Sequence, residues 1–320
     1  MKVFVAGASG AVGKPVVREL VERGHDVVAM TSTAQKRSVL EEQGASAVAG
    51  DVFDAAGVAE LVRAAQPEGV VNVASKWSGN PSRVSQVAPA NEIRVTGARN
   101  VVAAAVAAGA RRYVNESMMF VYGYGDHPEP LTEADPPARV ESSGLQRVVD
   151  AIVAAEAAVR EQTESGAIEG SCVRFGLFHG PRAPSTRLMF DLVRKRRLPL
   201  VGSGDTIRSW IELDDAARAV VDVLERAPAG AVYNVVDDEP VAMRDYVGEI
   251  ARLTGAKPPR KVPRWVLKVG ASYVAAAFGG GRLPVSNAKL RDELGWTPRS
   301  PTYREALRAF STSDGGATSA

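Results

Sequence analysis

The stretch that decides the fold is KVFVAGASGAVG, residues 2–13, a short apolar run followed at once by three glycines at three-residue spacing. The apolar run predicts a strand over residues 2–6, and the sequence after it predicts a helix over 11–22. A glycine-rich turn between a strand and a helix brings main-chain N–H groups and the helix N-terminus against a phosphate. The stretch therefore predicts a Rossmann-type turn that binds the pyrophosphate of a dinucleotide.

The three glycines of this turn have separate roles. Gly7 allows the tight turn, Gly10 lets the main chain approach the pyrophosphate, and Gly13 allows the helix to pack closely on the strand. The helix N-terminus adds unpaired N–H donors and a partial positive charge. The cofactor contacts predicted from the turn are Gly7, Ser9, Gly10, Ala11, Val12 and Gly13.

The end of the second predicted strand decides between NAD and NADP. A carboxylate at this point accepts a hydrogen bond from the ribose 2′-OH of NAD and repels a 2′-phosphate. Residues 30–37 read MTSTAQKR, with no acid and with two cations, Lys36 and Arg37. This pattern favours NADP(H) over NAD(H), although both cations also fit the solvated first turn of a helix. The remaining predicted cofactor contacts are Ser32, Asp51 and Val52 after the third strand, and Ala74 after the fourth.

Strand-like and helix-like segments alternate through the first half of the chain. Strands are expected at 2–6, 26–30, near 47, 69–73, 112–116 and 170–175, with helices at 11–22, 34–43, 55–65, 91–108 and 146–162 between them. Such alternation predicts parallel strands with helices on both faces, because right-handed crossovers return the chain to the same sheet. The fold class expected is α/β, a doubly wound Rossmann-type sheet with a smaller C-terminal substrate-binding lobe.

The regular alternation ends after residue 175, where prolines punctuate shorter segments. We expect an NADP(H)-binding domain over 1–175, with returning segments near 205–236. A substrate-binding lobe is expected over most of 176–311, and the small, polar residues 312–320 are expected to be disordered.

Composition narrows the partners of the chain. It has 320 residues, 45% of them hydrophobic, and 39 basic against 37 acidic residues leave a formal charge of only +2. The net charge therefore creates no strong electrostatic field that would attract the protein to nucleic acid or to an anionic membrane. No apolar stretch reaches the roughly 18 residues of a membrane span, so we expect a cytoplasmic protein.

The single cysteine, Cys172, is expected to be a buried, inert thiol. Three scattered histidines give no metal-binding spacing.

Several short motifs resemble the extended short-chain dehydrogenase/reductase family. Besides the glycine turn they are Gly50-Asp51, TGARN at 96–100, Val121-Tyr122-Gly123, Arg174 with Gly180-Pro181, RSWI at 208–211 followed by Asp214-Asp215-Ala216, and Tyr233-Asn234-Val235. They cover nearly the whole chain in the right order, and within that family the chain is similar to epimerase/dehydratase-type members. The resemblance implies the fold, a nicotinamide dinucleotide, a substrate domain in the second half, and a possible homodimer through the long Ala-rich helices.

The proton relay of that family is missing from this sequence. Its members use a Ser or Thr with a Tyr-x-x-x-Lys pair, in which the lysine lowers the pKa of the tyrosine. No tyrosine of this chain has a lysine four residues later. The family pattern places Val148 and Ile152 at the tyrosine and lysine positions and Met118 at the serine position. The resemblance therefore supports the fold and the cofactor better than the reaction.

Polar residues beyond the carboxyl ends of the strands are the candidates to replace the relay. Lys76 follows the fourth strand and either acts as an acid, binds an anion or is a solvated loop residue. Glu116 and Ser117 end the fifth strand, and strand alternation turns one toward the cofactor and the other toward the core. In an apolar pocket Glu116 would have a raised pKa and could move a proton, and the alternative is a salt bridge to Arg111 or Arg112.

The other candidates lie further along the chain. Tyr122 and Tyr124 are on the loop after the fifth strand, where either could supply a proton, although Tyr122 also fits a structural role. His179 follows the sixth strand as a hydrogen-bonded wall or a proton donor. Arg208 resembles the arginine with which sugar-nucleotide members bind a phosphate, and a packed guanidinium near Asp214 is an equal alternative.

These observations predict an atypical NADP(H)-dependent oxidoreductase that transfers hydride to a small carbonyl- or enone-bearing substrate with a nonstandard proton donor. Two alternatives stay open. One is a non-redox cyclase, isomerase or dehydratase on the same fold, and the other is a non-catalytic NADP(H)-sensing protein.

Overall fold

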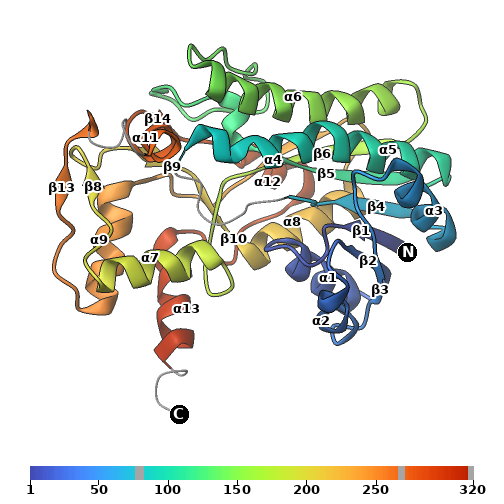
Figure 1. The fold of residues 1–320 in the computed structure, drawn as a ribbon, viewed down its shortest axis with the longest axis horizontal. Coiled ribbons are helices and arrows are strands. Elements are labelled where there is room, and N and C mark those ends of the chain that lie inside the picture. Colours follow the sequence, from blue (N-terminus) through green and yellow to red (C-terminus); the bar gives the residue numbers. More distant parts are fainter. Residues whose placement is uncertain (76–82, 266–270, 316–320) are drawn as a thin grey trace.

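The computed structural model describes residues 1–75, 83–265 and 271–315. A seven-stranded parallel sheet forms its centre, in the order β11-β6-β5-β4-β1-β2-β3 (Figure 1). The strands are β1 (Lys2–Ala6), β2 (Asp26–Thr31), β3 (Ser46–Ala49), β4 (Gly69–Asn72), β5 (Arg112–Met118), β6 (Glu169–Phe175) and β11 (Val232–Val235). The strand order reverses between β1 and β4, and ligands of such sheets bind outside the carboxyl ends of the strands at this switch. The predicted Rossmann-type fold is confirmed.

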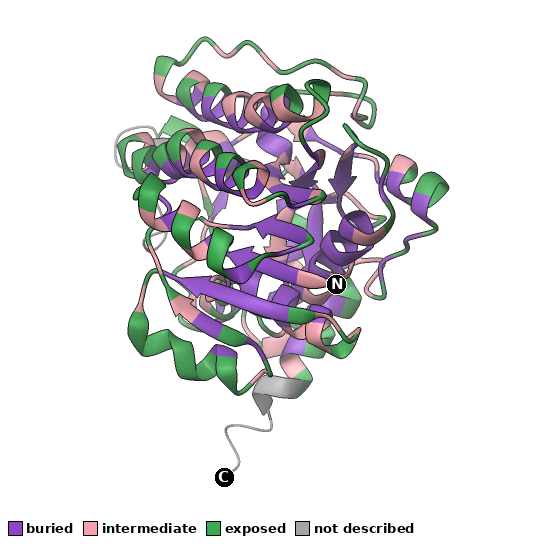
Figure 2. Cartoon of the chain, turned by 90° about the vertical axis from the view of Figure 1, so that its right-hand side faces the viewer, coloured by how far each residue is buried: buried purple, intermediate pink, exposed green. Residues whose placement is uncertain are grey.

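Helices cover both faces of this sheet, because some crossover connections pass over one face and the others pass over the opposite face. One face packs against α3 (Ala55–Ala65), α5 (Ala98–Ala107) and α6 (Ser143–Glu164), and the other against α1 (Gly13–Glu22), α2 (Arg37–Glu41) and α8 (Leu213–Arg226). Figure 2 shows the strands buried and the outer sides of the helices exposed. Cys172 lies in the core, as expected.

The helix expected over 91–108 is longer and less regular than predicted. It begins as α4 (Ala88–Glu92), continues through a π-helical turn (Ile93–Gly97) and ends as α5. Single π-turns of this kind are often found at functional sites because they redirect one side chain. Here the turn carries Arg94, which becomes important below.

The C-terminal half returns to the large sheet through α8 and β11 and otherwise builds smaller units. β7 (Leu177–His179) pairs with β10 (Trp210–Glu212), β8 (Leu200–Val201) with β13 (Lys261–Val262), and β9 (Ile207–Arg208) with β12 (Val241–Ala242) and β14 (Arg282–Leu283). Helices α7 (Pro184–Arg194), α9 (Met243–Thr254), α11 (Ser272–Phe278), α12 (Ala288–Leu294) and α13 (Tyr303–Gly315) complete this half. Residues 312–315, for which composition predicted disorder, are the end of α13.

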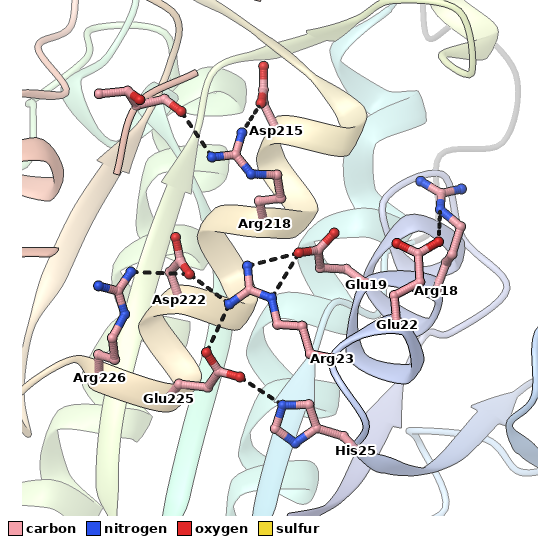
Figure 3. A network of polar contacts seen from close by, with 11 residues as sticks. Arg18, Glu19, Glu22, Arg23, His25, Asp215, Arg218, Asp222, Glu225 and Arg226 are labelled. Carbon is pink, nitrogen blue, oxygen red and sulfur yellow. Dashed lines mark hydrogen bonds and ion pairs between the residues drawn. The ribbon is translucent and has the colours of Figure 1, made fainter. Parts of the chain in front are cut away.

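Ion pairs fasten the returning helix α8 to α1. Arg23 donates to Glu19, Asp222 and Glu225, each at 2.8 Å, and Glu225 also contacts His25 Nε2 at 2.8 Å (Figure 3). One arginine therefore joins the first crossover to a helix about 200 residues later. Among the described residues, no helix has the length and apolarity needed to cross a membrane.

Candidate functional site

The glycine turn between β1 and α1 has a geometry that only glycine allows. Gly7 has a φ of +80°, and a Cβ on it would lie 2.5 Å from the main chain of Ala74. A Cβ on Gly13 would lie 2.2 Å from the Gly7 carbonyl oxygen, so α1 can approach β1 this closely only without a side chain. A Cβ on Gly10 would meet only that same oxygen, at 3.1 Å, which leaves the other side of Gly10 open to a ligand.

The other residues of the turn are placed by the neighbouring strand. The Ser9 hydroxyl shares a hydrogen bond with Thr31 Oγ1 at 2.8 Å, while Ala11 is exposed and Val12 packs into the core. Val12 therefore presents its main chain to the site rather than its side chain. This arrangement leaves main-chain N–H groups at the start of α1 available to a pyrophosphate.

The residues after β2 are exposed and include one cation without a salt bridge. Ser32, Lys36 and Arg37 are all exposed, and Arg37 forms a 3.5 Å contact with Glu41. Within the described parts of the chain, Lys36 has no ion pair. A free ammonium group thus lies just beyond the carboxyl end of β2.

The ends of β3 and β4 complete this edge. Asp51 accepts a hydrogen bond from the Phe53 N–H at 3.1 Å, and the Val52 carbonyl accepts one from Asn100 at 2.9 Å. Ala74 follows β4 and contacts the turn at Gly7. The edge offers an open glycine main chain and a helix N-terminus, so the residues present fit a nicotinamide dinucleotide.

One side of β5 carries a closed polar network. Buried Ser117 donates to Glu156 Oε1 at 2.5 Å, and Arg174 binds both oxygens of the Glu156 carboxylate at 2.8 Å each. A third N–H of Arg174 donates to the Tyr122 hydroxyl at 2.8 Å, and that hydroxyl reaches the Thr132 carbonyl at 2.8 Å. Ser117 and Tyr122 are therefore held by internal partners.

Beside the other side of β5 lies Arg94, whose guanidinium group is only partly hydrogen-bonded. Glu116 Oε1 lies 3.8 Å from Arg94 Nη2, and the Arg94 Nη2 also contacts the Met118 sulfur at 2.7 Å. Arg94 is 5% exposed, and its Nε and Nη1 have no partner. Burial raises the pKa of Glu116 to about 7, against a smaller opposing effect of Arg94. The salt bridge considered for Glu116 with Arg111 or Arg112 is not formed, since Glu116 contacts Arg94 instead.

Tyr124 extends this second cluster toward the C-terminal half. Its buried hydroxyl interacts with the hydroxyl of Tyr273, its ring stacks on Phe120 at 4.7 Å, and it lies close enough to Arg94 and Arg208 for their charges to affect it. Burial raises the pKa of Tyr124 well above its usual value. Tyr124 also lines a cavity of about 590 Å³, together with residues of the 122–145 segment and of 264–280.

Comparison with known proteins places this site in a family. The sequence model of the NAD dependent epimerase/dehydratase family matches residues 3–236. The chain belongs to this family. It is therefore an enzyme of the short-chain dehydrogenase/reductase type.

Individual relatives agree with this assignment. The chain is 30% identical to the 3-diazoavenalumate denitrifying reductase of a Streptomyces species, over 96% of this chain and 99% of that one. It is also 30% identical to the 2-alkyl-3-oxoalkanoate reductase of Stenotrophomonas maltophilia, over 80% and 76%. The UDP-glucose 4-epimerase of Thermotoga maritima shares the fold, with a TM-score of 0.80 at 17% identity over 98% and 99% of the two chains.

The three residues that the sequence pattern assigns to the proton relay, Met118, Val148 and Ile152, are apolar and packed. Val148 and Ile152 on α6 are 1% and 0% exposed, and they lie in a core cluster against which Met118 packs. No hydroxyl or ammonium group can therefore reach a substrate from these three positions.

Arg208, for which the sequence left phosphate binding and internal packing as equal alternatives, is fully buried. Its guanidinium donates to the carbonyls of residues 207, 276, 277, 280 and 281, at 2.6 to 3.4 Å. The expected packing is observed, but not near Asp214, which binds Arg18 and Arg182. Arg208 holds the 276–281 segment in place and has no donor left for a phosphate.

Of the remaining candidates, the structure describes His179. His179 is 0% exposed beside the stacked rings of Trp210 and Tyr246, and its Nε2 is 3.5 Å from Asp237 Oδ2. Burial lowers the pKa of His179 to about 3, so its ring is neutral. Lys76 lies outside the described residues. Within the residues that are described, no group of three or more metal-ligating side chains is found.

Sequence reasoning missed Arg94 and Tyr273. Arg94 contacts Glu116 across 22 residues of chain, and no motif links the two. The signal that was available is a basic residue among mostly apolar neighbours in the expected helix, in IRVTG at 93–97.

Proposed function

We propose that this protein is an NADPH-dependent reductase of a small carbonyl- or enone-bearing substrate, with Glu116 as the proton donor. The observation that carries this proposal is the position of Glu116. Its carboxyl group is largely buried at the carboxyl end of β5, and its contact with Arg94, at 3.8 Å, is too long for a hydrogen bond.

The preference for NADPH rests on the end of β2. The exposed Ser32 and the unpaired Lys36 lie where the 2′-phosphate of NADP(H) would be held, and no acid follows β2 before Glu41. Loss of Lys36 should weaken NADPH binding about 1.5- to 5-fold and leave NADH binding unchanged, the effect of one exposed ion pair. Calorimetric titration of wild type and Lys36→Ala with both nucleotides measures this difference, with Arg63→Ala on α3 as the control.

In this proposal the proton comes from Glu116 rather than from a tyrosine. When bound, the nicotinamide supplies the hydride. Glu116 has a pKa raised to about 7, so near neutral pH it is protonated in a large fraction of molecules and can give a proton to a substrate oxygen or carbon. Tyr124 keeps its proton throughout this range because burial raises its pKa, and its buried hydroxyl can only hydrogen-bond.

The substrate should be small rather than a sugar nucleotide. The guanidinium of Arg208 is fully used by carbonyl groups and offers nothing to a diphosphate. Two of the 30% identical relatives are named as reductases of organic acids, one of them a 3-oxoalkanoate, and this supports a small carbonyl substrate here.

A second candidate follows from the apolar relay positions. A substrate whose reduction ends with a neutral leaving group, such as dinitrogen departing from a diazonium carbon, needs no proton at an oxygen. The packed Val148 and Ile152 fit such a reaction, and the Streptomyces relative is named a denitrifying reductase of a diazo compound. In this case Glu116 would have no role as a proton donor.

Glu116→Gln separates these two reactions. NADPH oxidation is followed with panels of 3-oxo acids, enones and arenediazonium salts. If Glu116 donates the proton, the variant loses 10²- to 10⁴-fold in kcat on the carbonyl substrate, and the wild-type rate falls as the pH rises through about 7. An unchanged kcat on a diazonium salt would favour the second candidate. Failure of wild type to bind any nicotinamide nucleotide would overturn both.

A further inference from the structure

Three buried arginines of the described chain differ in what their guanidinium groups bind. They are Arg94, Arg174 and Arg208, with exposed fractions of 5%, 5% and 0%. Arg174 binds a carboxylate and a hydroxyl, and Arg208 binds main-chain carbonyls. Arg94 alone among the three has N–H groups, Nε and Nη1, without any acceptor.

The charge of Arg94 is only weakly balanced by its surroundings. Its acidic neighbour, Glu116, is 3.8 Å from Nη2, too far for a hydrogen bond, and its carboxyl group is neutral in a large fraction of molecules near pH 7. Its other contact is the thioether of Met118, a weak acceptor. A buried cation with unmet hydrogen bonds is strongly unfavourable, so such a group persists where a ligand completes it.

We propose that Arg94 is the anion-binding residue of the substrate pocket and that the substrate is a small organic monocarboxylate. This proposal rests on the proposed function and adds the chemical class of its substrate. One free guanidinium, with Arg208 fully occupied, matches a single negative charge rather than a phosphate or a dicarboxylate.

The neighbours of Arg94 favour a flat, apolar body for that carboxylate. Tyr124, stacked on Phe120, and Tyr273 lie beside the cluster, and the Met118 side chain contacts Arg94 from the end of β5. These side chains offer aromatic and thioether surface, which binds planar groups well. A conjugated or aromatic acid would fill this surface while its carboxylate neutralises Arg94.

Binding of a carboxylate at Arg94 would also prepare Glu116 for its role. A second negative charge close to Glu116 disfavours its ionised form, because like charges in a buried site cannot both be tolerated. The substrate would therefore keep the Glu116 carboxyl group protonated until the proton is needed. In this arrangement Arg94 is a substrate-binding residue, and Glu116 is the acid.

Paired probes that differ only in charge test the proposal. Calorimetry would measure binding of cinnamate against cinnamamide and of 3-oxobutanoate against its amide, at pH 7, with and without saturating NADP⁺. At least one carboxylate should bind ten times or more tightly than its amide. Arg94→Met should bind acid and amide alike with unchanged NADP⁺ affinity, and Arg94→Lys should keep part of the preference.

The matched control is Arg139→Met, which removes an exposed cation lining the neighbouring cavity and should keep the preference for acids. Two results would overturn the proposal: no preference for either acid in wild type, or a preference that survives in Arg94→Met. The wild-type comparison needs no variant and remains decisive if Arg94→Met does not fold. If NADP⁺ binds but no acid is preferred, the inference fails while the proposed function stands; if NADP⁺ does not bind, the proposed function fails.

Discussion

The two sides of β5 carry similar polar residues and organise them in opposite ways. On one side Arg174 meets Glu156 through two 2.8 Å hydrogen bonds, and Ser117 and Tyr122 close the network. On the other side Arg94 approaches Glu116 only to 3.8 Å and keeps unpaired N–H groups. A buried arginine with every donor used stabilises the fold, whereas one with donors left over is available to a ligand.

The largest expected effect is on the closed side. Arg174→Met leaves the Glu156 carboxylate buried with only Ser117 as a partner, and breaking a buried pair in this way costs about 3–5 kcal/mol. Urea unfolding monitored by circular dichroism gives the free energy of unfolding. Arg160→Met, on α6 like Glu156 but in an exposed pair with Glu164, should change it by less than about 0.5 kcal/mol. Equal effects of the two substitutions would show that the closed network is not a structural unit.

A pH-dependent effect of intermediate size is expected at Glu116. Its pKa is raised in the folded state from 4.5 to about 7, so stability is lost as the pH rises through this range. At about 1.4 kcal/mol per pH unit, the loss is at most roughly 3.5 kcal/mol. Glu116→Gln cannot ionise, so its stability relative to wild type should increase between pH 5 and pH 8.

Unfolding curves at the two pH values measure this change, and exposed Glu164→Gln on α6 is the control. A constant difference between Glu116→Gln and wild type across the range would mean that Glu116 is ionised in the folded protein. Glu116 would then be unsuited to donate a proton at neutral pH.

The fold and the cofactor turn could be predicted because their signals are local. The glycine spacing at residues 7, 10 and 13 and the alternation of strands with helices are properties of short windows, and the structure shows what each glycine allows. Strand alternation also predicted that Glu116 and Ser117 face opposite sides. It could not say which side is closed, because that depends on Glu156 and Arg174, 39 and 57 residues after Ser117.

Arg94 was missed for the same reason. Its partners come from β5 and from the segment around 122–124, and its unpaired N–H groups are visible only once those elements are placed. From the sequence alone, Arg94 is a basic residue in a predicted helix, and such residues are normally solvated. Burial also distinguishes between the alternatives left open for Arg208 and His179. Arg208 binds main-chain carbonyls instead of a phosphate, and His179 is a neutral buried ring.

The smallest change in stability should come from Arg94, and it tests the comparison most directly. The measurement is urea unfolding of Arg94→Met at pH 6, where the Glu116 carboxyl group can take up a proton after losing its neighbour. We predict an unfolding midpoint equal to that of wild type or higher, because the substitution removes an uncompensated buried charge. A midpoint that falls as far as that of Arg174→Met would show that Arg94 is a structural residue and would contradict the assignment of this side of β5 to the substrate.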